Sequence, residues 1–382
     1  MALRGVRVLE MAGLAPSPFA GLILSDYGCD VIRVDRCSPA NFDTMVRGKR
    51  SIALDLKRKE GSSLLMKLIQ ASDVLIEPYR PGVMERMGLG PDLCLKQNPE
   101  LVYARLTGFG QMGPLSKKAG HDINYLAISG LLSCLGPRSL PPNPPINLLA
   151  DFVGGSLFCV LGILTALITR QRTGRGQVVD VSMVDGAAYL STFLLTTQSS
   201  GMWAGDRGNN LLDGGAHFYS VYRTRDDKYL AVGAIEPQFY AQLLEGLNLR
   251  GNDLPAQMDI NSWPDLKERF QKIFSEKDRD DWLKIFSNLD ACVTPVLDLH
   301  SGEAALDNAN KDRNVFDTSE QPYIPKPAPR LQGTPAVYRP SVGIYVGEHT
   351  HSILSEVLSM SHENIRHLFE QKIVQSYPPT KL

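Results

Sequence analysis

VRVLEMAGLAPSPFAGLILSDYGCDVIRVD, residues 6–35, contains the pattern that decides the fold. Residues 6–10 and 30–35 are short apolar runs typical of β-strands, and residues 16–27 form an apolar-periodic helix that ends at Gly28. Further strand-like runs at 51–56, 73–77 and 101–106 are separated by helical stretches. This alternation predicts an α/β fold with a doubly wound, mostly parallel sheet.

The loop after the first strand excludes one class of enzyme. Residues 10–16 are EMAGLAP, and they lack the Gly-x-Gly-x-x-Gly that binds a dinucleotide. The sequence therefore gives a nicotinamide-dependent dehydrogenase no support.

The chain of 382 residues is longer than one compact core usually holds, which favours two domains. A second region begins near residue 215, with strands expected at 218–223, 228–233 and 292–297. A helix is expected from Pro237, and two amphipathic helices lie within 263–287. The proline-rich stretches 321–329 and 335–340 are expected to be extended.

The charges nearly cancel, since 40 Lys and Arg face 41 Asp and Glu, for a net charge of −1. No overall field attracts nucleic acid or a membrane surface, so any anion must be bound by a local basic cluster. The six cysteines are widely spaced, which indicates neither a disulfide framework nor a metal site and favours a reducing compartment.

Two segments bear on location. Residues 146–168 are largely apolar, but Gly154 and Gly155 interrupt them, which favours a buried core helix over a membrane span. The last three residues, Thr380, Lys381 and Leu382, resemble the Ser-Lys-Leu peroxisomal signal, with a frayed tail as the alternative.

His121 is the histidine best placed for chemistry. It stands in AGHDINY (119–125), where Gly120 frees the backbone and Asp122 can cap the following helix. A helix N-terminus disfavours the charged imidazolium, which leaves the ring ready to act as a base. A structural histidine beside a helix cap is the alternative.

Asp151 interrupts an apolar run, NLLADFVGG (147–155), and a buried carboxylate is costly unless it is paired or protonated. It is a second candidate for proton transfer, or else an N-cap for the helix that follows. Glu236, at a strand–helix junction, is similarly placed.

Several basic residues follow expected strands. Arg36, Lys57 and Arg80 come just past strand ends, where open parallel sheets bind ligands, and they could hold a polyphosphate. Each alone is more often a solvated surface charge. Other candidates for such a rim are Arg47, Lys49, Arg50 and Arg86.

Long ordered blocks resemble the α-methylacyl-CoA racemases of the family III CoA-transferase superfamily, from about residue 3 to 330. The blocks are VIRVDR (31–36), RGKRSIALDLK (47–57), YRPGVMER (79–86), AGHDINY (119–125), NLLADF (147–152), RTGRGQVVD (172–180), LDGGAHFY (212–219) and AVGAIEPQFY (231–240). The resemblance implies a large CoA-binding α/β domain over 1–200, completed by 331–382, and a small α+β domain over 215–330. It also implies an interlocked homodimer.

The resemblance assigns roles to matching residues. It implies that His121 and Asp151 transfer protons on opposite faces of the α-carbon and that Glu236 hydrogen-bonds the histidine. It further implies CoA or substrate contacts by Arg36, Leu54, Asp55, Leu56, Lys57, Arg86, Gly120, His121, Asp122, Ile123, Asn124 and Tyr125. Backbone N–H groups around Asp122 are the expected oxyanion donors.

The implied reaction inverts 2-methyl-branched acyl-CoA thioesters through an enolate, with no metal or redox cofactor, since CoA is part of the substrate. It places the protein in peroxisomes, mitochondria or both. His217 stands where the family usually has proline, which could alter substrate preference if its loop lines the acyl pocket.

Two other functions remain open from the sequence. A family III CoA-transferase would use Asp122 as a nucleophile that forms an acyl anhydride. A non-catalytic CoA-binding protein would have no use for His121, Asp151 and Glu236 together.

Overall fold

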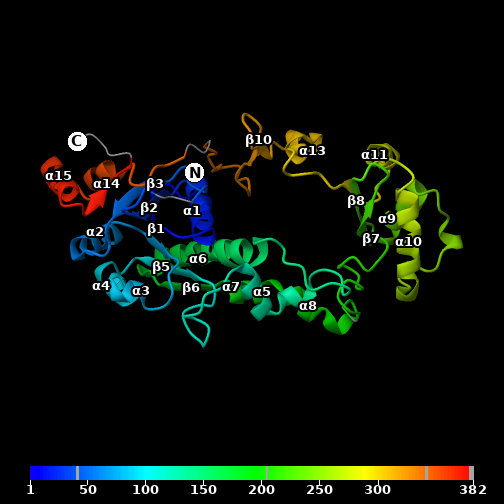
Figure 1. Ribbon diagram of the computed structural model, residues 1–382, viewed down its shortest axis with the longest axis horizontal. Helices are drawn as coiled ribbons and strands as arrows, with labels where there is room; N and C mark the ends of the chain where they lie inside the picture. Colours follow the sequence, from blue (N-terminus) through cyan, green and yellow to red (C-terminus); the bar gives the residue numbers. More distant parts are fainter. Residues whose placement is uncertain (40–42, 204, 340–342, 378–382) are drawn as a thin grey trace. The chain divides into compact units, whose positions relative to one another are not determined.

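The computed structural model describes residues 1–39, 43–203, 205–339 and 343–377 (Figure 1). The chain divides into two compact units. The large unit comprises Met1–Leu131, Pro145–Leu190 and Pro327–Leu382, and the small unit comprises Leu132–Pro144 and Ser191–Lys326. The peroxisome-like residues Thr380, Lys381 and Leu382 lie outside the described residues.

A seven-stranded sheet with the strand order β12-β3-β2-β1-β4-β5-β6 organises the large unit. Strands β1 to β6 pair in parallel, and β12 joins β3 antiparallel. The strands are β1 Arg7–Met11, β2 Asp30–Arg36, β3 Arg50–Leu54, β4 Val74–Glu77, β5 Val102–Thr107, β6 Val178–Ser182 and β12 Val374–Gln375. The predicted doubly wound, mostly parallel sheet is confirmed, and the five expected strands of residues 1–110 agree within two residues at each end.

Helices cover both faces of this sheet, as the alternating pattern requires. Helices α1 and α6 pack together on one face, and α2, α3, α4, α14 and α15 contribute to one apolar core on the other. The helices are α1 Pro16–Asp26, α2 Lys59–Gln70, α3 Val83–Arg86, α4 Pro91–Gln97, α5 Asp122–Ser129, the π-helix η2 Leu148–Leu157, α6 Phe158–Thr173, α7 Met183–Leu190, α14 Thr350–Glu356 and α15 His362–Glu370. Strands β4 and β5 are buried along their whole length, which is typical of parallel strands covered on both sides.

The C-terminal segment completes the β3 edge of the sheet. Helices α14 and α15, red in Figure 1, lie beside β3 and α2. The Thr350 hydroxyl accepts from the Ala53 N–H at 3.2 Å and donates to the Gln375 carbonyl at 2.9 Å. Thr350 thus holds the C-terminal segment against β3, about 300 positions away in the sequence, through hydrogen bonds to both β3 and β12.

The small unit has an aromatic-rich core under a three-stranded antiparallel sheet, β7-β8-β9. Its elements are β7 Tyr219–Arg223, β8 Tyr229–Gly233, β9 Val293–Pro295, α8 Thr192–Thr196, α9 Pro237–Gly246, α10 Trp263–Phe274, α11 Arg279–Phe286, α12 Glu303–Leu306, α13 Asn308–Asp312 and the short pair β10 Phe316–Asp317 and β11 Ile324–Pro325. The helix from Pro237 and the two amphipathic helices occur where the sequence predicts them. Short 3₁₀ turns occur at Leu131–Cys134, Gln198–Ser200, Gly251–Asp253 and Ile260–Ser262.

Within the described residues, one helical stretch, Leu148–Thr173, is long and apolar enough to cross a membrane. Less than half of its most apolar window is buried in the chain. The expectation of a buried core helix therefore holds for one face only, since Cys159 and Ile163 are fully buried whereas Leu161 is 58% exposed.

Candidate active site

A cavity of about 570 Å³ opens at the edge of the sheet where the parallel strands end. It is lined by Arg36, the last residue of β2, and by residues that follow β1, β4 and β5, namely Ala12–Ser17, Pro78–Arg80 and Gly108. The strand order changes direction between β1 and β4, and open α/β sheets bind ligands outside such a switch point. We call this cavity the proton-transfer cavity, because His121 and Asp151 also line it.

Gly13 allows the loops after β1 and β4 to approach each other. A Cβ at this position would lie 2.6 Å from Cγ of Pro78. The loop that follows β1 therefore needs a glycine for contact with the neighbouring loop, and this requirement explains the single glycine in EMAGLAP better than a dinucleotide site does.

His121 is the N-cap residue of α5 and is exposed. Its backbone N–H donates to Oδ1 of Asn124 at 3.0 Å, and its carbonyl accepts from the Asn124 N–H at 2.8 Å. The two bonds fix the start of the helix, and His121 lines the cavity from this position.

The residues around His121 pack closely behind it. A Cβ on Gly120 would lie 2.7 Å from the Tyr125 ring, and one on Gly108 would lie 2.1 Å from it. The Tyr125 hydroxyl donates to the Gly120 carbonyl, and its ring meets Phe109 edge-on. Burial, reinforced by the charge of Asp151, raises the pKa of Tyr125 to about 12, so its hydroxyl stays protonated near neutral pH.

Asp151 lies in η2 and is partly buried. Burial raises the pKa of Asp151, and the negative charge of Asp122 adds to this effect. A hydrogen bond from Nδ2 of Asn147 to Oδ2 at 3.4 Å and the proximity of His121 oppose it. His121 and Asp151 therefore line one cavity, and the charge of His121 favours the ionised form of Asp151. Their role as a proton-transfer pair stays a prediction.

Asp122 has a structural role. It is 3% exposed, and Oδ2 accepts from the backbone N–H groups of Ala150 and Asp151, both at 2.8 Å. Its carboxylate thereby ties the start of α5 to the start of η2 and fixes His121 relative to Asp151. It is absent from the cavity lining, so the geometry argues against Asp122 as a nucleophile.

A second cavity, of about 830 Å³, adjoins the first through two shared residues, Arg36 and Tyr79. Its lining includes Leu54, Asp55, Leu56 and Lys57, the segment expected to contact CoA. We call it the Lys57 cavity. Tyr79 hydrogen-bonds the Arg36 side chain, and its hydroxyl donates to the Ala12 carbonyl at 3.2 Å.

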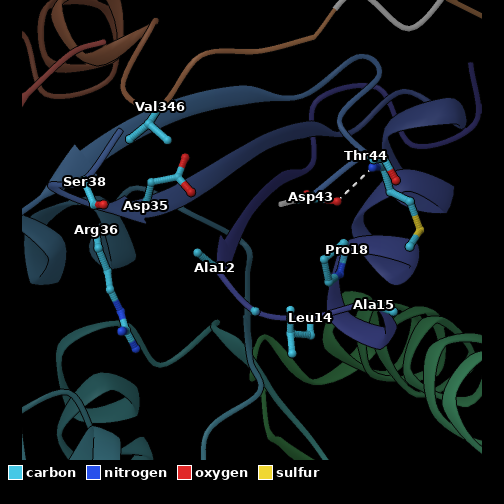
Figure 2. Close-up of a pocket in the computed structure, with 12 residues that line it drawn as sticks. Ala12, Leu14, Ala15, Pro18, Asp35, Arg36, Ser38, Asp43, Thr44 and Val346 are labelled. Atoms are coloured by element: carbon cyan, nitrogen blue, oxygen red, sulfur yellow. Dashed lines mark hydrogen bonds between the residues drawn. The ribbon is translucent and has the colours of Figure 1, made fainter. Parts of the chain in front are cut away.

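Arg36 also lines a third cavity, of about 600 Å³, between the Ala12–Ala15 loop and the end of β2. Figure 2 shows Asp35, Arg36 and Ser38 on one side of it, with Leu14, Ala15 and Pro18 on the other. Arg36 thus lines all three cavities at this sheet edge.

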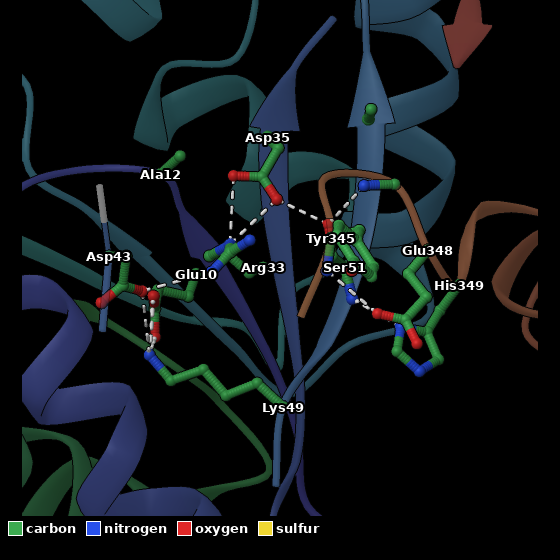
Figure 3. Close-up of polar contacts among 12 residues, drawn as sticks. Glu10, Ala12, Arg33, Asp35, Asp43, Lys49, Ser51, Tyr345, Glu348 and His349 are labelled. Carbon is green, nitrogen blue, oxygen red and sulfur yellow. Dashed lines mark hydrogen bonds and ion pairs between the residues drawn. The ribbon is translucent and has the colours of Figure 1, made fainter. Parts of the chain in front are cut away.

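The basic loop at residues 47–50 is structural and does not form an anion-binding rim. Arg47 pairs with Asp26 at 2.6 Å, and Arg50 pairs with Asp30 at 2.6 Å and Glu356 at 2.9 Å. Lys49 is fully buried, and its ammonium donates to both carboxylate oxygens of Glu10, as Figure 3 shows. It also donates to the Pro18 carbonyl. Their positive charges are used inside the fold, because carboxylates lie against all three. Arg80, in contrast, lines the proton-transfer cavity.

The remaining predicted residues occupy varied positions. Arg86 is exposed at the end of α3 and is absent from the cavity linings described above, although Val83 and Met87 line the Lys57 cavity. Ile123 and Asn124 are exposed on the first turn of α5, outside these linings. Glu236 is the N-cap residue of α9 in the small unit, and its pairing with His121 stays a prediction.

His217 is a core residue of the small unit. It is fully buried, its Nε2 lies 2.9 Å from the Tyr240 hydroxyl, and its ring meets Phe218 and Phe270 edge-on. Burial lowers the pKa of His217 to about 4. His217 does not line the three cavities described above. An effect of His217 on substrate preference through contact with the acyl chain therefore has no support from these cavities.

The sequence profile of CoA-transferase family III matches residues 3–350. The chain belongs to this family. Alpha-methylacyl-CoA racemase from Mus musculus is 53% identical over 377 residues, and the Homo sapiens protein of the same name is 50% identical over 378 residues. Both alignments cover 98% of this chain and 98% of the relative.

The solved structure of a CAIB/BAIF family protein from Brucella suis superposes with a TM-score of 0.79 at 23% identity. The superposition covers 93% of this chain and 99% of that one, which establishes the shared fold. The family profile ends at residue 350, where α14 begins, and so does not include the C-terminal segment that packs on β3.

Four contributors to this family III site escape the sequence reasoning. Tyr79 is the second residue after the end of β4, so the rule that selected Arg36 could also have found it. Asn147 stands four residues before Asp151, on the same helical face. Lys372 and Gln375 line the Lys57 cavity from the far end of the chain, and no local pattern reveals that placement.

Proposed function

We propose that this protein interconverts (R)- and (S)-2-methylacyl-CoA thioesters by removing the α-proton and returning one on the opposite face. The observation that carries the proposal is the placement of His121 and Asp151 on one cavity at the switch point of the sheet. The 50% and 53% identical relatives named alpha-methylacyl-CoA racemase support the same chemistry.

Two proton-transfer groups are needed because a single base would return the proton to the face that it came from. In one direction His121 removes the proton and Asp151 donates, and in the other direction the roles reverse. The raised pKa of Asp151 suits this exchange, since it favours the protonated form that can donate. Glu236 is proposed to hold the imidazole by a hydrogen bond.

The enolate oxygen needs donors that are in place before charge develops. The first N–H groups of α5, at Asp122 and Ile123, have no carbonyl partner within the helix and carry the positive end of its dipole. We propose these N–H groups as the oxyanion donors, which requires the thioester oxygen to reach past the cavity lining to the start of α5, beside His121. The bonds from Ala150 and Asp151 to Asp122 hold that helix start in register with η2.

Coenzyme A enters the scheme as part of the substrate. With the thioester in the proton-transfer cavity, the pantetheine arm passes Arg36 and Tyr79, and the nucleotide occupies the Lys57 cavity. Binding of this remote part positions the reacting carbon. The reaction exchanges a proton and transfers no electrons, so the proposal needs no redox cofactor, and it assigns the stabilisation of the enolate to backbone N–H groups instead of a metal ion.

A homodimer is also part of the proposal. Exposed apolar side chains gather on α6 and its neighbours in the large unit: Leu157, Leu161, Ile168, Val178 and Tyr189. A second copy of the chain would cover them.

We further propose a peroxisomal or mitochondrial location, which fluorescence microscopy of the tagged chain with and without residues 380–382 tests.

Deuterium exchange tests the proposed reaction. In D2O, either enantiomer of a 2-methylacyl-CoA should racemise and gain deuterium at C2. His121→Ala and Asp151→Asn should each slow racemisation by about 10²- to 10⁴-fold. His300→Ala, which removes an exposed histidine of the small unit, is the matched control and should have no effect.

The same assay separates the alternatives. Transfer of CoA to an acceptor acid without exchange at C2 would replace the racemase with a transferase. CoA binding with neither reaction would leave a binding protein.

A further inference from the structure

Lys372 occupies a backbone position that normally selects glycine. It is the first residue beyond the C-cap of α15 and has φ of +55°, in the left-handed region. Its N–H donates to the Phe369 carbonyl at 2.9 Å, and the Ile373 N–H donates to the Leu368 carbonyl at 3.0 Å. These are the two bonds of a Schellman motif, whose left-handed residue is usually glycine because it lacks a Cβ.

The side chain of Lys372 lines the Lys57 cavity. The cavity has three cationic residues, Arg36, Lys57 and Lys372, and two acidic ones, Asp35 and Asp55. Asp35 is bound by the Arg33 guanidinium and the Ser51 hydroxyl, at 2.9 and 2.6 Å, as Figure 3 shows. The charge of Asp35 is therefore already compensated by Arg33 inside the fold. The remaining charged residues of the lining, Arg36, Lys57, Lys372 and Asp55, carry a net positive charge.

The turn that carries Lys372 is fastened to the segment that carries Lys57. The Asp55 N–H donates to the Ile373 carbonyl at 2.9 Å, and the Arg58 guanidinium donates to the Gln371 carbonyl. Next to it, Val374 and Gln375 pair with Leu54 and Ala53 of β3. The two lysines thus approach the cavity from opposite ends of the sequence on backbones that are hydrogen-bonded together.

We propose that Lys372 is a binding residue for the phosphate groups at the nucleotide end of the acyl-CoA substrate. This inference rests on the proposed function. A flexible ammonium on a fixed turn is suited to phosphate, which it binds as a point charge. The C-terminal segment thereby takes part in substrate binding, although the family profile ends at residue 350.

Calorimetric titration with free CoA and with adenosine 3′,5′-bisphosphate tests the assignment without relying on catalysis. Lys372→Gly relieves the backbone conformation while removing the charge, so the variant should unfold at no lower temperature than the wild type. It should bind both ligands about 10- to 150-fold more weakly, the loss expected for one charge-assisted hydrogen bond. Lys372→Arg should retain affinity, and both proteins should bind adenosine equally.

Lys59→Ala is the matched control, because Lys59 is exposed nearby at the start of α2 but is absent from the cavity lining. Unchanged binding of CoA by Lys372→Gly, or an equal loss in Lys59→Ala, would overturn the assignment of Lys372. If the wild type binds CoA but gives no exchange at C2, the racemase proposal fails while the phosphate assignment stands. If the wild type binds no CoA, both fail.

Discussion

Asp151 shows how single neighbours tune a candidate catalytic carboxylate. Burial and the charge of Asp122 favour its protonated form, whereas the Asn147 hydrogen bond and His121 favour the ionised form. These influences come from residues four to thirty positions away in the sequence, so each can be altered separately. The raised pKa is thus a property of the surroundings and not of the aspartate alone.

Opposite shifts in pH dependence follow for two substitutions. When Asp151 is the base, the rate falls as pH drops through its pKa. Asn147→Ala removes a hydrogen bond to the ionised form, so the pKa rises and the acidic limb of kcat/KM should move to higher pH. Asp122→Asn removes a negative charge but keeps an oxygen that can accept from Ala150 and Asp151, so this limb should move to lower pH.

The measurement is the pH–rate profile for the enantiomer whose proton Asp151 removes. Asn143→Ala is the control, because Asn143 is an exposed asparagine that does not line the proton-transfer cavity. The pH–rate profile of Asn143→Ala should match that of the wild type. Shifts of the same sign in Asn147→Ala and Asp122→Asn would show that Asp151 does not set this limb.

At the scale of elements, a glycine contact sets the position of η2. A Cβ on Gly186 of α7 would lie 2.0 Å from the Gly154 carbonyl oxygen, and one on Gly154 would lie 2.9 Å from the Ala187 nitrogen. The two helices therefore touch backbone to backbone. Asp151 lies one turn before this crossing, so the contact positions the carboxylate.

Gly186→Ala should displace η2 and reduce kcat more than it raises KM. Overpacking of this kind costs about 1–3 kcal/mol, so the unfolding temperature should also fall. Steady-state kinetics and thermal unfolding check both effects. Gly251→Ala, whose Cβ would meet only Leu244 Cδ1 at 3.6 Å, should change neither. A normal kcat in Gly186→Ala would show that Asp151 does not depend on this crossing.

These elements also show where sequence reasoning stops. The spacing of apolar residues, together with the glycines and prolines that end elements, predicts the strands and α1, because these signals are local in the sequence. From the sequence, Gly154 and Gly155 are only interruptions of an apolar segment that could cross a membrane. Helix α7, whose contact requires Gly154, is about thirty residues away in the sequence. Similarly, Arg47, Lys49 and Arg50 were candidates for anion binding because Asp26, Glu10 and Asp30, their partners, lie in other elements.

At the scale of the whole chain, the family resemblance supplied what local patterns left open. By spacing alone, His121 is also compatible with a structural histidine beside a helix cap, and Asp151 with an N-cap. In the structure His121 is the N-cap residue of α5, the Asp122 carboxylate accepts from the first free N–H groups of η2 at Ala150 and Asp151, and Asp151 lines the cavity. The contribution of Lys372 was not predictable from the sequence, since it depends on the antiparallel pairing of β12 with β3.

The outer face of α6 provides a test of assembly. Leu161 and Ile168 are seven residues apart, so they lie on one side of the helix, and they are 58% and 54% exposed. A second copy is the occupant that we propose, since the net charge of −1 offers little attraction to an anionic membrane. Replacing both residues with lysine would place charges in the interface and should convert a dimer into a monomer.

Light scattering should give twice the chain mass of 42.1 kDa for the wild type and the single mass for the double variant. Leu299→Lys, at a 65% exposed leucine of the small unit, should stay dimeric. A wild type that is monomeric at every concentration would refute the dimer. Co-sedimentation of the wild type, but not of the double variant, with phospholipid vesicles would assign this face to a membrane instead. Because a charge on α6 leaves the His121 and Asp151 cavity intact, loss of racemisation in the monomer would show that catalysis requires the second copy.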